Sequence, residues 1–210
     1  MPFFRTFRTQ WIHVNLNDLA KILAPMDVVE NPFLDAQWVD NLLGAMQLPN
    51  NVHTCTYGGF LEDRSHLWRG HYFKKGPVHL GVDFNVPKNV AVTLPCDGTL
   101  VESFQDPDQN GGWGGKVTYD CDGFFLTFAH LKEIPPEYRI GDKFLAGDGV
   151  GFTAAQTQNG GWFEHLHVQA SRTFDPNRDG YVEELYDGIE EDFFDPIEIV
   201  NRKRICKNCN

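Results

Sequence analysis

The segment that decides the fold reads Trp162-Phe-Glu-His165-Leu-His167-Val-Gln169. Its alternating polar and apolar residues, with Trp, Phe and Val among them, predict a half-buried β-strand. Residues two apart in a strand project from the same face, so the imidazoles of His165 and His167 are expected to point to one side. One of them can bind a metal ion while the other stands beside it.

A second segment, His79-Leu-Gly81-Val-Asp83-Phe, places a histidine and a carboxylate four residues apart. Four residues of extended chain span roughly 13 Å, which is too far for two ligands of one ion. Gly81 and the run from Val82 to Pro87 nevertheless favour a strand over a helix. We therefore expect the chain to bend, with His79 in a turn or at a strand edge, Gly81 as the flexible point and Asp83 in the strand proper.

A third element is His130, which stands alone in Phe128-Ala-His130-Leu. A lone histidine in an apolar strand is usually a hydrogen-bonded core or surface residue, and each of the two pairs is also a weak signal by itself. All three elements, however, lie in one glycine-rich, strand-patterned stretch. Histidine and carboxylate ligands can leave one position on zinc open for water, and neighbouring histidines can move that water's protons. The combination predicts a metal-dependent hydrolase.

This stretch resembles the M23 family of zinc metallopeptidases, the lysostaphin-like peptidoglycan endopeptidases. The matching motifs occur in the family's order and cover about residues 75 to 170, roughly half of the chain. They are His79-Leu-Gly-Val-Asp83-Phe, Pro95-Cys-Asp-Gly-Thr-Leu, Gly114-Gly-Lys-Val-Thr-Tyr, Phe128-Ala-His130-Leu, Ala146-Gly-Asp-Gly-Val-Gly and His165-Leu-His167-Val.

The resemblance implies a role for each of the five candidate site residues. It makes His79, Asp83 and His167 the ligands of one Zn²⁺ ion. It makes His130 and His165 the catalytic histidines, which polarise the attacking water and stabilise the oxyanion at the scissile carbonyl.

The leading functional prediction is a zinc metalloendopeptidase that hydrolyses the peptide crosslinks of peptidoglycan. One alternative is a zinc-dependent hydrolase of another peptide or amide. It is suggested by the segment from Trp162 to Glu164, because family members commonly have Pro or Gly before the His-x-His pair. A second alternative is a non-catalytic binding module on the same scaffold. The presence of all five site residues argues against that module, because a pure binder has no need of an open metal site with two flanking histidines.

Composition limits the other possibilities. The chain has 210 residues, of which 41% are apolar, enough for one good core and a small accessory piece. It carries 18 basic and 29 acidic residues, and the resulting formal charge of −11 opposes binding to nucleic acid or to anionic membranes. No apolar run is long enough to span a bilayer. The N-terminus lacks the features of a secretory signal, so the protein is cytoplasmic as written, or reaches an extracellular or periplasmic site by signal removal, lysis or specialised secretion.

Three regions are expected along the chain. Residues 1–75 form an accessory segment, helical over 15–47 and irregular beyond 50, which either packs on the catalytic sheet or covers its cleft. Residues 76–200 form the peptidase domain, with strands at about 78–86, 90–94, 98–104, 115–120, 123–131 and 162–169. Residues 201–210 form a C-terminal tail. Short strands with close turns indicate antiparallel pairing, so the fold class is mainly β, an antiparallel sheet or sandwich of the M23 type with a small helical segment, α+β overall.

An acidic insertion at about 172–193 contains a second candidate metal site. Asp175, Asn177 and Asp179 place oxygens at alternate positions before Gly180, as in the first half of a calcium loop. The twelfth position is Tyr186 instead of glutamate. The segment is therefore either a Ca²⁺ site with a substitute ligand or a solvated turn.

The five cysteines lie outside the proposed metal ligands. Because the count is odd, at least one of them is not in an intramolecular disulfide. They are Cys55, Cys96, Cys121, Cys206 and Cys209. Cys206 and Cys209 have the spacing of a metal knuckle or a redox pair but lack the second half of a zinc site, so we expect inert thiols in the tail.

Overall fold

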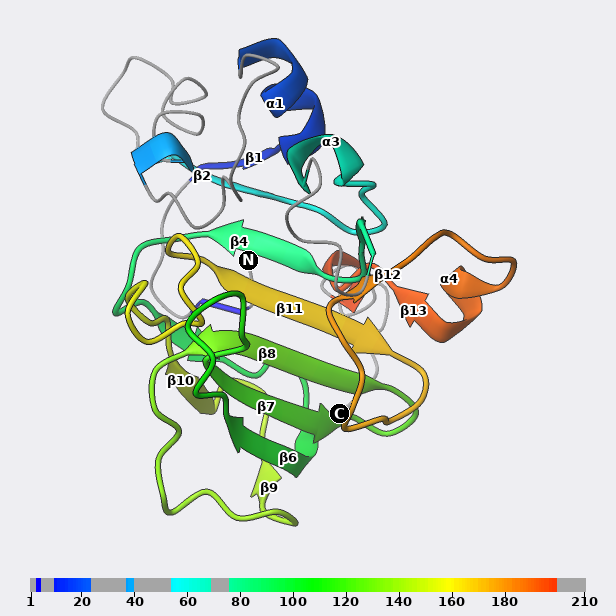
Figure 1. The fold of residues 1–210 in the computed structure, drawn as a ribbon. Coiled ribbons are helices and arrows are strands. Elements are labelled where there is room, and N and C mark those ends of the chain that lie inside the picture. Colours follow the sequence, from blue (N-terminus) through cyan, green and yellow to red (C-terminus); the bar gives the residue numbers. More distant parts are fainter. Residues whose placement is uncertain (1–2, 5–9, 24–36, 40–53, 69–75, 200–210) are drawn as a thin grey trace.

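A computed structural model of the protein describes residues 3–4, 10–23, 37–39, 54–68 and 76–199. Its centre is one large sheet with the strand order β1-β2-β4-β11-β8-β7-β6-β9, and β13 also pairs with β11 (Figure 1). The strands are β1 Gln10–His13, β2 Thr54–Gly58, β4 Val82–Asn85, β6 Gly98–Gln105, β7 Gly115–Asp120, β8 Phe125–Leu131, β9 Lys143–Phe144, β11 Leu166–Ser171 and β13 Phe193–Phe194. Only β1 and β2 pair in parallel among these strands. The predicted mainly β, antiparallel class is confirmed.

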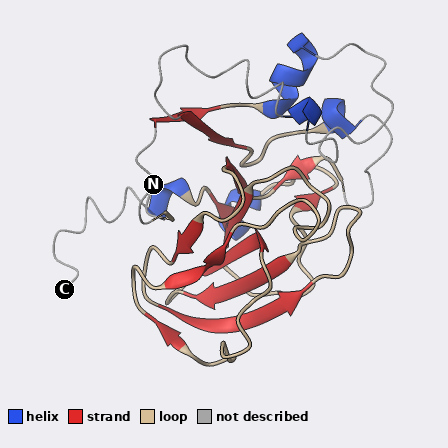
Figure 2. Ribbon diagram, turned by 90° about the vertical axis from the view of Figure 1, so that its left-hand side faces the viewer, coloured by secondary structure: helices blue, strands red, loops and turns tan. Residues whose placement is uncertain are grey.

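Two short strand pairs and several helices complete the described part of the chain. β3 Val78–His79 pairs with β12 Tyr181–Val182, and β5 Ala91–Thr93 pairs with β10 Gly149–Phe152. The helices are α1 Leu16–Leu23, α3 Ser65–Trp68 and α4 Ile189–Asp192, and residues 37–39 and 197–199 are also helical. Figure 2 shows α1 and α3 close together at one end of the molecule, above the strands. No described helix is long and apolar enough to cross a membrane.

Helix α1 corresponds to the first helix expected from the sequence. The side chain of Asn15 caps it, because Asn15 Oδ1 accepts a hydrogen bond of 2.8 Å from the backbone N–H of Asp18. The helix ends at Leu23, two residues before Pro25, which could not continue it. Most of the remaining predicted helical segment, and the tail with Cys206 and Cys209, lie outside the described residues. The division of the chain near residue 75 stays a prediction.

The two faces of the sheet differ in chemistry, as the alternation along β11 requires. Leu166, Val168 and Ala170 belong to the hydrophobic core, together with residues of β4, β7 and β8. His167 and Gln169 lie between them in sequence and therefore project from the opposite face. Every residue of β11 is buried, so this polar face is also covered.

Phe84 of β4 joins the N-terminal residues to the core. Its side chain is fully buried, and its ring centroid lies 5.2 Å from that of Phe3, 5.6 Å from those of Phe4 and Trp11, and 6.0 Å from that of Tyr57. Aromatic pairs at these separations add to the stabilisation that burial provides. One side chain thus packs against β1, β2 and residues 3–4 at once.

Replacing Phe84 by alanine should lower the free energy of unfolding by about 3–5 kcal/mol, because the cavity would lie among four rings that cannot all move inward. Chemical denaturation followed by circular dichroism measures this change. Ile140→Ala is the matched control, since Ile140 is 71% exposed and should change stability by no more than about 0.5 kcal/mol. Equal losses for the two variants would contradict a core organised around Phe84.

Candidate metal centre and active site

The register between β4 and β11 places Asp83 directly opposite His167. Cross-strand partners share a face of the sheet, so the two side chains meet without any loop to position them. His79 ends β3, and the predicted bend follows it, because β4 begins only at Val82. Within this bend Leu80 N–H donates a hydrogen bond of 2.8 Å to Gly180 O, which fixes the turn against the β12 segment. The bend brings His79 back to Asp83.

Gly81 has a different role from the flexible point that the sequence suggested. Its backbone is not in the left-handed region that requires glycine, because the described residues with positive φ do not include it. A Cβ atom at this position would instead lie 2.5 Å from Cε1 and 2.6 Å from Nε2 of His167. Glycine is required here for the close approach of the His167 ring.

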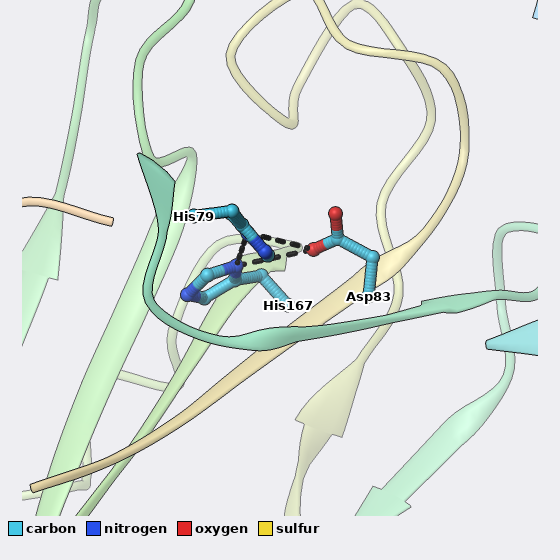
Figure 3. A group of neighbouring side chains, drawn as sticks. All are labelled: His79, Asp83 and His167. Carbon is cyan, nitrogen blue, oxygen red and sulfur yellow. Dashed lines mark hydrogen bonds and ion pairs between the residues drawn. The ribbon is translucent and has the colours of Figure 1, made fainter. Parts of the chain in front are cut away.

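The three predicted ligands meet at one point. His79 Nε2 lies 3.0 Å from His167 Nδ1 and 3.4 Å from Asp83 Oδ1, and His167 Nδ1 lies 3.1 Å from Asp83 Oδ1. Figure 3 shows the three side chains pointing toward one another. Ligands of a tetrahedral zinc ion at its usual bond lengths are about 3.4 Å apart, so the observed separations fit one ion. It is also the only such group of three or more His, Cys, Asp or Glu residues within the described ranges.

The outward nitrogens of the two ligand histidines explain why a cation fits between them. His79 Nδ1 lies 3.0 Å from Gly59 O, a carbonyl that can only accept, so the ring carries its proton there and Nε2 has a lone pair. His167 Nε2 faces the Gln169 Oε1 atom at 3.3 Å, which directs the Nδ1 lone pair inward in the same way. Two lone pairs and a carboxylate oxygen converge, and a metal cation satisfies all three.

A proton on His79 or Asp83 would not take the place of a metal cation between the three ligand atoms. Burial and the nearby Arg64 guanidinium hold the pKa of His79 well below its ordinary value, so its ring is neutral at neutral pH. Burial alone would raise the pKa of Asp83, but His79, Arg64 and His165 together hold it well below its usual range. The Asp83 carboxylate is therefore ionised and the His79 ring neutral, which are the states in which these two groups bind zinc.

A β-bulge places His130 in the site. Between β7 and β8, Gly115 pairs with Leu131 and Val117 with Phe128, so two residues of β8 oppose one of β7. The second of these two residues is His130, whose φ of 63° lies in the left-handed region. Such a conformation costs a non-glycine residue about 1–3 kcal/mol, and bulges next to active sites commonly re-aim a side chain. The strain is thus associated with the placement of one imidazole.

His130 and His165 form a second pair of imidazoles beside the three ligands. Their ring centroids are 4.3 Å apart, and His165 Nε2 lies 3.7 Å from Asp83 Oδ1. His130 Nδ1 lies 2.8 Å from Asn159 O and His165 Nδ1 lies 2.8 Å from Phe163 O, so both rings donate Nδ1–H to a carbonyl. Each therefore keeps a lone pair on Nε2. Burial lowers the pKa of both rings, which makes them neutral bases at neutral pH.

These five residues line a pocket of about 450 Å³, a volume that includes the space open to solvent at its mouth. Its walls combine aromatic rings with glycines whose backbone is exposed to the cavity. The other lining residues are Arg64, Gly111, Gly112, Trp113, Trp162, Phe163, Asp179, Gly180 and Tyr181. Trp162 Nε1–H donates to Gly112 O at 2.8 Å, which ties together two of the loops that form the wall. Trp162 and Phe163, which precede the His-x-His pair, thus both line the cavity.

The structure thus brings together all five residues that the sequence singled out, and their assignment to zinc binding and catalysis stays a prediction. Three supporting residues were not identified from the sequence: Gly59, Arg64 and Gln169. Arg64 Nη2 donates a hydrogen bond of 2.8 Å to Asp83 Oδ2, yet it lies in a stretch without clear periodicity. Gln169 could have been found, because it follows His167 by two residues on the same face of a predicted strand.

The structure gives no support to the predicted calcium loop. Asp175 Oδ1 accepts a hydrogen bond of 2.9 Å from Asn177 N–H, which closes a local turn. Asp179 contributes its backbone oxygen to Gln169 Nε2 at 3.4 Å. No described group of three or more His, Cys, Asp or Glu ligand atoms includes Asp175 or Asp179. The alternative of an Asp/Asn turn describes this segment.

A scan against protein-family models and a search of curated proteins found no match. Solved structures similar to this chain include the solution structure of lysostaphin (20% identity, 60% of this chain and 44% of that chain, TM-score 0.44). They also include the catalytic domain of lysostaphin, an antimicrobial peptidase from Staphylococcus simulans (19%, 60% and 80%, TM-score 0.43). A third is the catalytic domain, as a variant, of the prophage-encoded M23 protein EnpA from Enterococcus faecalis (21%, 54% and 82%, TM-score 0.39).

The match therefore spans less than half of the length of full lysostaphin. Of these three similar structures, that of EnpA is described as an M23 protein.

Gly81→Ala should reduce zinc uptake although it removes no ligand, because the added methyl group would displace the His167 ring. A loss of at least ten-fold in affinity, measured by competition with a chromogenic chelator, is the expected result. Gly149→Ala is the control, since a Cβ there has no atom within 4 Å and Gly149 is not among the described glycines with positive φ. Unchanged zinc affinity in Gly81→Ala would show that the His167 ring is not a ligand in this position.

Proposed function

We propose that this protein is a zinc metallopeptidase that cleaves peptide bonds, with the peptide crosslinks of peptidoglycan as its substrate. One observation carries the proposal: three lone-pair atoms of His79, Asp83 and His167 converge at 3.0–3.4 Å, beside two further imidazoles with free Nε2 lone pairs. A site that only needed to hold a metal for stability would have its fourth ligand from the protein. Among the described residues this group has three ligands, and all three line the pocket.

When bound, zinc supplies a water molecule of lowered pKa and polarises the substrate carbonyl. The protein's own groups supply the remaining steps. His165, beside Asp83, is placed to accept a proton from the attacking water at Nε2. His130 lies beside it, with ring centroids 4.3 Å apart, and its Nε2 also carries a lone pair, so it is placed as a second base. Whichever ring takes up the proton of the water can then pass it from Nε2 to the leaving nitrogen of the scissile amide. Both rings are held by Nδ1–H bonds to carbonyls, so neither has to reorient during the reaction.

The walls of the pocket support a peptide as the substrate. Trp113, Trp162 and Phe163 offer flat apolar surfaces, while Gly111, Gly112 and Gly180 let a substrate backbone approach the cavity closely. Such a cavity accepts an extended chain with small side chains. The resemblance of the sequence motifs to peptidoglycan endopeptidases makes the crosslinks the first substrate class to test.

Purified muropeptides should be cut in the presence of Zn²⁺ and left intact after removal of the metal by a chelator, with mass spectrometry identifying the new termini. His167→Ala should lose both zinc and activity. His130→Ala should keep zinc at full stoichiometry while its turnover falls by about 10²–10⁴-fold, because it removes an acid–base group and no ligand.

Two outcomes would overturn parts of this proposal. Loss of stoichiometric zinc in His130→Ala would mean that the ligands are wrongly assigned. If the zinc-loaded protein leaves every muropeptide intact but cuts unrelated glycine-rich peptides, its substrate is another peptide and not the crosslinks. Ile140→Ala serves as the activity control, because Ile140 is exposed and is not among the residues that line the pocket.

The pH profile should reflect the lowered pKa values of the two catalytic histidines. The reaction needs neutral imidazoles, and burial lowers the pKa of His130 and His165 below the ordinary value of 6.5. Activity should therefore stay on its plateau at pH 6.5 and fall only at lower pH. Measuring kcat/KM together with bound zinc across this range separates protonation of the bases from loss of metal. A half-maximum at or above pH 6.5 with zinc retained would contradict neutral buried bases.

A further inference from the structure

The segment from Gly59 to Arg64 is docked along the chain that carries His79. Leu61 N–H donates to His79 O at 2.9 Å, and His79 N–H donates to Glu62 O at 3.0 Å. Arg64 N–H donates to Pro77 O at 2.9 Å. Three backbone hydrogen bonds therefore fix this segment against β3 and the residue before it, although its residues show no periodic pattern.

The same segment contacts two of the three candidate metal ligands through their outer atoms. Gly59 O accepts the Nδ1–H of His79 at 3.0 Å. Arg64 Nη2 donates to Asp83 Oδ2 at 2.8 Å, and both side chains are almost completely buried. One ligand is thus oriented by a carbonyl and the other by a guanidinium, both from within six residues of chain.

Arg64 is itself held from several sides. Its Nη1 donates to Tyr181 Oη at 2.8 Å, and its Nε lies 3.7 Å from Glu62 Oε1. Glu62 Oε1 also accepts a hydrogen bond of 2.7 Å from Asn17 N–H in the first turn of α1. A Cβ at position 59 would lie 2.4 Å from Arg64 Nη2, so glycine leaves room for the guanidinium. The position of the Arg64 guanidinium is therefore determined by several neighbours and not by Asp83 alone.

We propose that Arg64 is a positioning residue that makes Asp83 a one-oxygen ligand and so keeps a coordination position on the metal open. The inference rests on the proposed function, because it needs a metal at this site. Asp83 presents Oδ1 to the two histidine nitrogens, while Arg64 occupies Oδ2. A carboxylate with both oxygens available can bind an ion through two atoms. With Oδ2 engaged, only Oδ1 reaches the ion, and the fourth position remains for water or substrate.

The positive charge of Arg64 also supports a positioning role beside Asp83. A buried Asp83 without a partner would be costly, and a buried guanidinium supplies both a compensating charge and a directed hydrogen bond. Lysine would preserve the charge but not the planar arrangement of donors that lets one side chain contact Asp83, Tyr181 and Glu62 together. Geometry and charge can therefore be separated by substitution.

The test compares the parent protein with Arg64→Lys and Arg64→Met, all as the full chain. Zinc affinity is measured by competition with a chelator, and the Co²⁺-substituted proteins are compared by visible absorption, which reports coordination number and geometry. Both variants should bind zinc about 10–100-fold more weakly, as expected when the partner of a ligand is removed. Their Co²⁺ spectra should shift toward a higher coordination number, and kcat should fall more than KM rises.

Lys116→Met is the matched control. Lys116 is also a buried cation, and its Nζ lies 2.9 Å from Glu102 Oε1, but none of its described contacts is to a metal ligand. This variant should lose stability without a change in the Co²⁺ spectrum. If Arg64→Met does not fold, as judged by circular dichroism, the charge-preserving Arg64→Lys decides the question.

The outcomes distinguish this inference from the proposed function. If the parent binds Co²⁺ and Arg64→Lys has the same spectrum and affinity, the positioning role is wrong and the metal site stands. If the Arg64 variants and Lys116→Met lose affinity equally, Arg64 acts only through general stability, and the role is again wrong. A parent protein that takes up neither Zn²⁺ nor Co²⁺ would overturn the proposed function and this inference with it.

Discussion

The pairing of β4 with β11 in a register that sets Asp83 opposite His167 is the constraint on which the site depends. A slip of one residue would turn one of the two side chains to the other face of the sheet. The apolar residues on the core side, among them Val82, Phe84 and Val168, prevent such a slip, because they would then face the polar side. The same hydrophobic pattern that builds the core therefore fixes the geometry of the candidate ligands.

The site concentrates charged and polar side chains in a buried volume, and the surrounding backbone compensates for much of the cost. His79, His130 and His165 each direct their Nδ1 atom to a backbone carbonyl, those of Gly59, Asn159 and Phe163 respectively. The rings are thereby fixed before any substrate arrives, which is the form of preorganisation that electrostatic catalysis requires. The carbonyls come from irregular segments, so loops perform the orientation while strands set the spacing.

Much of the core of the fold could be predicted from the sequence because alternation is local. Strands β6, β7 and β8 lie close to their predicted ranges, and β11 overlaps its prediction. The expected strand over 78–86 divides at Leu80 and Gly81, because Leu80 N–H bonds to Gly180 across the bend. Strands β1, β2, β9, β10, β12 and β13 were not predicted, since they are only two to five residues long and their pairing is determined by other parts of the chain.

The candidate site could be predicted as a set of residues but not as a geometry. The motifs named the five site residues, while the bulge that aims His130 leaves no mark in Phe128-Ala-His130-Leu. Arg64 was missed for a related reason. It reaches Asp83 over 19 residues, from a segment whose contacts to β3 are made by backbone atoms and so carry no side-chain pattern. Its burial and its charge become informative only together, once the fold places it.

The distance along the chain between Asp83 and His167 has a consequence for biosynthesis. The two residues are 84 positions apart, and β11 must insert between β4 and β8 before they meet. Contacts of such long range cost more chain entropy to close than the local hairpins of β6, β7 and β8. During translation the nascent polypeptide therefore cannot bring the three candidate ligands together until β11 has left the ribosome.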